Sequence, residues 1–166
     1  GAVMVPCPWF QAAMELTRIN PEVDVGVHLT FTSEWQTYRW GPISSREWLS
    51  GMLDDQGYFF RTTAEAQERI DPAYAYIEME AQIQRMIQAG FLPSHMDTHM
   101  GTVAHPKFMQ AYVELALKYR LPLMMFRMGQ DDWRKKGLDA ETALIATHMG
   151  ETLESMGVPL LDNMTS

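Results

Sequence analysis

Cysteine and positive charge are both scarce in this sequence of 166 residues. The chain has one cysteine, Cys7, and 13 Lys and Arg residues against 21 Asp and Glu residues, which gives a formal net charge of −8 at pH 7. A single thiol can neither form an intramolecular disulfide nor share a metal with a second thiol, so a disulfide scaffold and a zinc finger are excluded. The acidic balance argues against a partner bound by neutralising phosphates, and we expect no nucleic acid partner.

Long apolar runs are missing as well. No uninterrupted apolar segment reaches the ~18 residues that a membrane span needs, and no basic stretch precedes the apolar start as it does in a signal peptide. We therefore expect no membrane partner and a cytoplasmic protein. Apolar material is nevertheless plentiful, because 46% of the residues are hydrophobic, which is enough for a core.

The chain shows no repeat, charge block or linker rich in Ser and Gly, which predicts a single domain over residues 1–166. Apolar periodicity and capping residues predict strands that alternate with helices, and hence an α/β fold with a mostly parallel sheet. Extended segments are expected at 2–5, 23–31, 93–100, 123–127 and 158–161. Helices are expected at 10–19, 72–89, 106–119 and 139–156. Residues 32–63 are expected to form a long loop with one short helix near 45–53.

The densest group of chemically useful side chains is His95, Asp97 and His99. In an extended segment, residues at i, i+2 and i+4 share a face, so all three would point the same way. A divalent metal or a hydrogen-bonded catalytic cluster would satisfy them together, whereas burying them without partners is unfavourable. A polar strand end, with Asp97 accepting a hydrogen bond from one imidazole, is the alternative. Spacing alone does not decide between the two.

His28 lies on the polar face of the second predicted strand, near its C-terminal end. Ligands gather at that end of the strands in parallel α/β folds. Imidazoles from two strands plus a carboxylate would suit zinc or a harder divalent ion, with positions left for water and substrate. We therefore group His28 with the cluster at 95–99, although a lone histidine on a strand is more often structural.

Three further residues are candidates for substrate binding, each with a structural alternative. His105 precedes a predicted helix, where an N-cap role would explain it. Arg127 ends a predicted apolar strand and could bind substrate or simply reach solvent. Trp35 belongs to an aromatic-rich stretch whose rings could stack on sugars or pack the loop. His148 falls on the apolar stripe of the last predicted helix and is interpreted as structural. Asp54 and its acidic neighbour, just before a glycine, are typical of a turn.

Two segments carry a resemblance to a known family. Residues 25–30 (VGVHLT) and 93–99 (PSHMDTH) are similar, in order and separation, to two segments of the YdjC-like carbohydrate deacetylases, the family of chitooligosaccharide deacetylase. Residues 3–10 (VMVPCPWF) resemble the family's second strand and the turn after it. The resemblance implies a partial, deformed (β/α) barrel with mostly parallel strands. It also implies that a divalent metal, Mg or Zn, assists removal of an acetyl group from an N-acetylated sugar.

By the same resemblance, His28 and His99 take the metal-ligand positions, and Asp97 and His95 stand beside them as catalytic residues. Family members begin with a strand that ends in an Asp-Asp-x-Gly type of motif, which supplies a third metal ligand and the general base. This chain starts after that point and stops before the family's later His-Pro-Gly type of segment. The resemblance therefore implies the central portion of a larger enzyme, with a carbohydrate substrate and weak or no activity on its own.

Two other classes of function stay open. A non-catalytic sugar-binding or interaction module would keep the substrate cleft and lack the catalytic activity. An unpaired edge of its sheet could pair with a second copy of the chain in a homo-oligomer. A metal-dependent hydrolase of another substrate class, such as a phosphoesterase, would use a similar cluster of His and Asp. The net charge of −8 weighs against anionic substrates.

Overall fold

The computed structural model describes residues 1–45 and 50–162. The chain divides into two compact units, Gly1–Leu121 and Pro122–Ser166. The first unit contains the strands β1 (Ala2–Val3), β2 (Gly26–Leu29) and β3 (Met96–Thr98) and the helices α1 (Phe10–Ile19), α2 (Thr63–Arg69), α3 (Pro72–Gln88) and α4 (Pro106–Tyr119). The second unit contains α5 (Gln130–Lys135) and α6 (Ala140–Ser155). The single domain expected over residues 1–166 stays a prediction.

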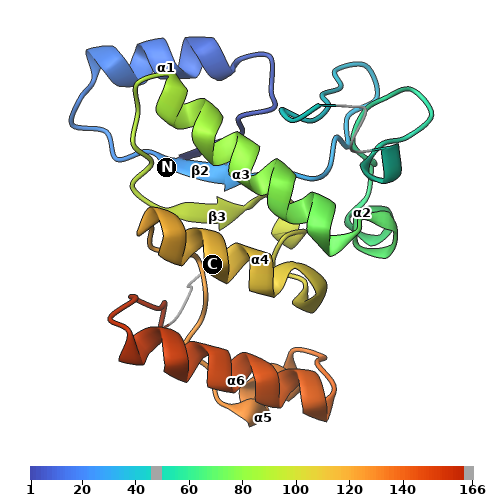
Figure 1. Cartoon of the computed structure of the whole chain (residues 1–166), viewed down its shortest axis with the longest axis vertical. Helices are drawn as coiled ribbons and strands as arrows, with labels where there is room; N and C mark the ends of the chain where they lie inside the picture. Colours follow the sequence, from blue (N-terminus) through green and yellow to red (C-terminus); the bar gives the residue numbers. More distant parts are fainter. Residues whose placement is uncertain (46–49, 163–166) are drawn as a thin grey trace. The chain divides into compact units, whose positions relative to one another are not determined.

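The three strands of the first unit form one parallel sheet in the order β1-β2-β3. Its register places Val27 opposite Met96 and His28 opposite Asp97. Helices and strands alternate along the first unit. In Figure 1, α3 crosses in front of β2, and the two elements are in contact, so a layer of helix covers the sheet. The α/β class is confirmed. Within the described residues the sheet does not close, and the barrel stays an expectation.

One face of this sheet is buried beneath helices. Val27, Leu29 and Met96 are completely buried, and Tyr112 Oη of α4 donates a hydrogen bond to the carbonyl of Met96 at 3.0 Å. Successive side chains of a strand point to opposite faces. The residues between these apolar ones therefore face the other side, which is where the histidine of β2 stands.

Two predicted helix starts are confirmed. The side chain of Asp71 accepts a hydrogen bond from the N–H of Ala73, and Pro72 opens α3. His105 caps α4 in the same way and Pro106 follows it. Proline suits this position because the first N–H groups of a helix have no partner inside the helix.

Other predictions of secondary structure are wrong. In place of the strands expected at 123–127 and 158–161, the structure has isolated bridge residues, and Phe126 pairs in parallel with Leu161. Both α2 and α5 were unexpected, although Thr62 marks the start of α2, where its Oγ1 accepts a hydrogen bond from the N–H of Glu65 and donates one to the Glu65 carboxylate. The short helix expected near 45–53 lies partly outside the described residues, which contain a 3-10 turn at Ser50–Met52.

Several apolar residues of α1 lie at the surface, and α6 is not buried along the apolar stripe that was expected for it. Leu16 and Ile19 of α1 are 61% and 71% exposed. In α6 the buried residues are Ala143, Gly150 and Leu153, so this helix packs through one leucine and two small residues.

His148 is therefore not a core residue. Its neighbours on the expected apolar stripe, Leu144 and Ile145, are exposed, and its own side chain is 69% exposed. Nδ1 of His148 lies 3.2 Å from Oε2 of Glu151 on the surface of α6.

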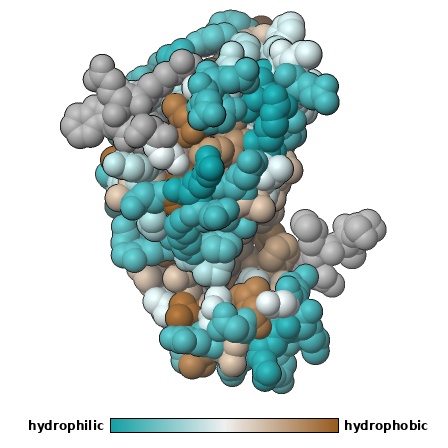
Figure 2. Space-filling model, turned by 90° about the vertical axis from the view of Figure 1, so that its right-hand side faces the viewer, coloured by the Kyte–Doolittle hydropathy of each residue, from teal (hydrophilic) through white to brown (hydrophobic). Residues whose placement is uncertain are grey.

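The surface is largely hydrophilic where it can be seen. On the face shown in Figure 2, hydrophilic residues cover most of the area and hydrophobic ones form small separate patches. Among the described helices, none combines the length and the apolar character needed to cross a bilayer.

Two polar residues of α3 are buried in its apolar face and bind the loop that follows β2. Gln82 accepts a hydrogen bond from the N–H of Thr30 at 3.0 Å and donates one to its carbonyl at 2.9 Å. Glu78 accepts from the N–H groups of Ile43 and Ser44 at 3.0 and 2.9 Å. Burial raises the pKa of Glu78, although these donors oppose the shift. Helix α3 thus holds both ends of the loop between Thr30 and Ser44.

Replacing Glu78 should destabilise the first unit. Glu78→Ala leaves the N–H groups of Ile43 and Ser44 without their acceptor, and we expect the free energy of unfolding to fall by about 2–4 kcal/mol. Urea denaturation followed by circular dichroism measures the change. Glu15→Ala, which breaks an exposed pair with Arg18, is the control and should cost less than about 1 kcal/mol. Equal losses from the two variants would contradict the proposed role of Glu78.

Candidate functional site

His28 and Asp97 form a pair between β2 and β3. Nδ1 of His28 lies 2.6 Å from Oδ1 of Asp97, and the two side chains are 25% and 23% exposed. An ionised carboxylate only accepts hydrogen bonds, so it holds the imidazole with a proton on Nδ1. In the neutral ring this leaves Nε2 of His28 with its lone pair.

His99 joins this pair although it lies beyond the end of β3. It begins a 3-10 turn, His99–Gly101, in which Met100 takes a positive φ of 53°. The ring centroids of His28 and His99 are 5.3 Å apart and the rings meet edge to face at 67°. The structure thus brings together both residues predicted to bind metal, with Asp97 beside them.

Glu34 is part of the site and was missed in the sequence. Its Oε2 lies 3.1 Å from Nε2 of His99, and the side chains of Glu34 and His99 are 28% and 15% exposed. Its position shortly after the C-terminal end of β2 is the same signal that singled out His28. The long loop carried no periodicity that could have pointed to it.

Cys7 is electrostatically close to this carboxylate. Burial, assisted by the negative charge of Glu34, raises the pKa of the Cys7 thiol to about 11. The thiol is therefore neutral at pH 7, which makes it a poor nucleophile and a poor metal ligand.

His95 packs on the same sheet, against Gly26. A Cβ atom added to Gly26 would lie 2.5 Å from Nε2 of His95, so the imidazole lies directly over the glycine. Its Nδ1 is 2.8 Å from Oγ of Ser94. Among the described residues its hydrogen-bond partner is thus Ser94, and the expected catalytic role of His95 stays a prediction.

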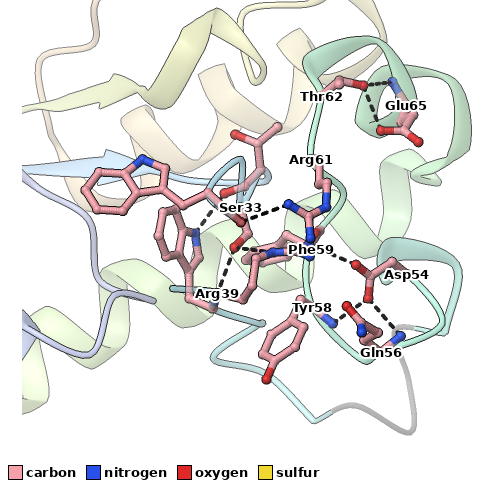
Figure 3. Close-up of polar contacts among 12 residues, drawn as sticks. Ser33, Arg39, Asp54, Gln56, Tyr58, Phe59, Arg61, Thr62 and Glu65 are labelled. Atoms are coloured by element: carbon pink, nitrogen blue, oxygen red, sulfur yellow. Dashed lines mark hydrogen bonds and ion pairs between the residues drawn. The ribbon is translucent and has the colours of Figure 1, made fainter. Parts of the chain in front are cut away.

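The backbone just before Glu34 is held by buried groups. Trp40 donates from Nε1 to the carbonyl of Thr32 at 2.8 Å and from its N–H to Oγ of Ser33 at 3.0 Å. Arg39 donates from Nε to the same Oγ at 3.1 Å, as Figure 3 shows. Because these partners fix residues 32 and 33, the position of Glu34 is constrained before its side chain makes any contact.

Arg39 extends this framework to the turn at Asp54. Its side chain is 5% exposed and donates from Nη2 to Oδ2 of Asp54 at 2.8 Å and to the carbonyl of Phe59 at 2.7 Å. Burial alone would raise the pKa of Asp54, but the N–H groups of Tyr58 and Gln56 and the Arg39 guanidinium outweigh it and lower that pKa. Oδ1 of Asp54 accepts from both of these N–H groups, so the turn predicted here is confirmed.

The three predicted substrate-binding residues lie in different surroundings. Trp35 is 60% exposed, and its ring contacts Tyr38 and Trp40 at centroid distances of 6.0 and 6.5 Å. His105 caps α4, and burial together with the charge of a neighbouring lysine lowers its pKa. Arg127 belongs to the second unit, where it pairs with acidic side chains of α6 and of the chain's end. Their roles toward a substrate stay predictions.

The donor atoms of the site suit a divalent metal in part. His28 and His99 each have one ring nitrogen hydrogen-bonded to a carboxylate, which is the usual arrangement around imidazoles that bind a metal through the other nitrogen. Within the part of the chain that the structure describes, no three His, Cys, Asp or Glu residues are spaced to hold one ion. Metal binding by His28 and His99 therefore stays a prediction.

Comparisons with known proteins identify relatives of the chain. The family model described as YdjC-like protein matches residues 2–165. A carbohydrate deacetylase of Thermoanaerobacter pseudethanolicus is 28% identical over 88% of this chain and 56% of its own length. One of Thermus thermophilus is 36% identical over 73% of this chain and 42% of its own.

A solved structure from Enterococcus faecalis, named for cellobiose-phosphate cleavage, superposes with a TM-score of 0.74 at 28% identity and covers 98% of this chain and 55% of that one. The chain thus spans about half the length of the relatives it matches.

The contact between Gly26 and His95 can be tested with a double-mutant cycle. Gly26→Ala places a methyl group against the imidazole and should lower the free energy of unfolding by about 1–3 kcal/mol. In a His95→Ala background the same change should cost almost nothing, because the ring is gone. Equal costs in the two backgrounds, measured by urea denaturation, would show that the ring does not lie over the glycine.

The ion pair of Asp54 predicts a pH-dependent stability. Because the pKa of Asp54 is lower in the folded state, its contribution is present above the ordinary Asp value of ~3.9 and is lost as pH falls through the folded value. Asp54→Asn should therefore lower the free energy of unfolding by about 1–3 kcal/mol at pH 7, and the difference from the wild type should shrink as pH falls through the lowered pKa of Asp54. Thermal unfolding across pH measures this. Asp55→Asn, at the exposed neighbour, should change little, and a constant difference for Asp54→Asn would contradict the argument.

Proposed function

The chain belongs to the YdjC-like protein family, and from this premise we propose that it supplies the metal-binding histidines of a carbohydrate deacetylase, which removes an acetyl group from an N-acetylated sugar. The curated relatives named carbohydrate deacetylase support the substrate class and the reaction. The observation that carries the proposal is the edge-to-face pair of His28 and His99, each with its own carboxylate.

In this proposal His28 and His99 bind a zinc or magnesium ion. When bound, the metal polarises the amide carbonyl and lowers the pKa of its water, which makes that water a better nucleophile. Asp97 holds the proton on Nδ1 of His28, so that the lone pair of Nε2 is available to the metal. This fixed tautomer avoids a rearrangement of the ring when the ion binds.

Trp35 is the proposed sugar platform. Its ring is exposed and stands next in sequence to Glu34, which contacts His99. The flat apolar face of an indole suits stacking against the apolar face of a pyranose ring. The ring of Trp35 also contacts the rings of Tyr38 and Trp40, which leaves most of the indole exposed.

The metal-binding proposal is tested by calorimetric titration with zinc. His28→Ala and His99→Ala should each weaken binding at least about tenfold, because each removes one of two protein ligands. His148→Ala is the matched control, since this exposed histidine also pairs with a carboxylate but lies on α6, and it should leave the affinity unchanged. Equal losses from all three variants would count against the site.

Acetate release from N-acetylglucosamine oligomers, with and without a chelator, tests the reaction. We expect slow release that the chelator abolishes, because residues 1–166 match only about half of the relatives' length. Sugar binding that survives the chelator, with no release of acetate, would favour a non-catalytic sugar-binding module instead. Release that does not need the metal would refute the proposed chemistry.

A further inference from the structure

We propose that Glu34 is a positioning residue of this site, which holds His99 in the tautomer with its proton on Nε2 and its lone pair on Nδ1. The hydrogen bond between Nε2 of His99 and Oε2 of Glu34, at 3.1 Å, carries the inference. An ionised carboxylate cannot donate a hydrogen bond, so the proton must lie on the imidazole nitrogen. The inference deepens the proposed function but does not need a metal to be tested.

The surroundings of this pair make it stronger than a surface ion pair. The side chains of Glu34 and His99 are 28% and 15% exposed, whereas those of Glu151 and His148, with nearly the same separation of 3.2 Å, are 65% and 69% exposed. Partial burial lowers the local dielectric and reduces competition from water. The described residues therefore contain two Glu–His pairs in different environments, through Nε2 of His99 and through Nδ1 of His148, and the partly buried pair holds its imidazole more firmly.

The loop before Glu34 is built to place the carboxylate. Gln82 binds both backbone groups of Thr30, and Trp40 binds the carbonyl of Thr32. Ser33 accepts hydrogen bonds from Trp40 and from the buried Arg39. These contacts fix Thr30, Thr32 and Ser33 before Glu34, so the backbone that carries Glu34 loses little further freedom when the carboxylate binds His99.

The two imidazoles are held through different nitrogens. Asp97 binds Nδ1 of His28, and Glu34 binds Nε2 of His99. The lone pairs that remain are on Nε2 of His28 and Nδ1 of His99. Glu34 thus does for His99 what Asp97 does for His28, and nothing in the sequence motif at 93–99 reveals it.

Nitrogen NMR of the imidazole rings tests the tautomer directly. At about pH 8, above the ordinary His range of ~6.5, the wild-type protein should show His99 with Nε2 protonated. Glu34→Ala should convert the His99 signals to a mixture of tautomers and leave those of His28 unchanged. Glu34→Gln, whose amide oxygen can accept the same hydrogen bond, should keep the Nε2–H form in most molecules.

Glu151→Ala is the matched control, because it removes the same type of contact from the exposed His148 and should leave His99 as it is. A wild-type His99 protonated on Nδ1, or signals that Glu34→Ala leaves unchanged, would overturn the proposal.

Zinc titration of the same variants separates this inference from the proposed function. If both hold, Glu34→Ala should weaken zinc binding about 10–100-fold and Glu34→Gln should weaken it less. Unchanged or tighter binding by Glu34→Ala would overturn the positioning role. If the wild type takes up no zinc at all, the metal of the proposed function is refuted, while the NMR result still decides whether Glu34 fixes His99.

Discussion

The parallel register between β2 and β3 is the constraint on which the candidate site depends. It sets His28 opposite Asp97 and, one step along, Val27 opposite Met96. Because side chains alternate between faces, the same register buries the apolar pair beneath the helices and gathers the polar pair on the other side. A slip of β3 by one residue would turn Asp97 to the buried face and Met96 to the other face, which would separate the carboxylate from His28.

The second support is the buried polar framework of the first unit. Glu78 and Gln82 sit among the apolar residues of α3, where unpartnered polar groups would be costly, and they replace the missing strand partners of the loop after β2. Arg39 adds the turn at Asp54 to the same network. The loop is thus irregular in secondary structure but fixed in position, which is what a loop needs if its side chains are to be held within reach of His99.

The charge pattern of the site differs from that of the surface. The chain carries a net charge of −8, and several ion pairs among the described residues are exposed, so that water and salt screen them. At the site, two carboxylates instead each bind one imidazole, and both pairs are partly buried. The acidic groups there act on the histidines first, and through them on whatever the histidines bind.

Local patterns in the sequence determined the helices with clear capping signals, the parallel α/β class and the group of His28, Asp97 and His99. These features follow from short stretches of sequence: a proline after a capping residue, apolar residues that recur every 3.6 or every 2 positions, and polar residues at the ends of strands. Only the tertiary structure decided that Glu34 contacts His99, that Glu78 is buried and that His148 is exposed. Each of these depends on which face of an element meets another element, or on where a loop without periodicity runs, and a one-dimensional pattern does not contain that information.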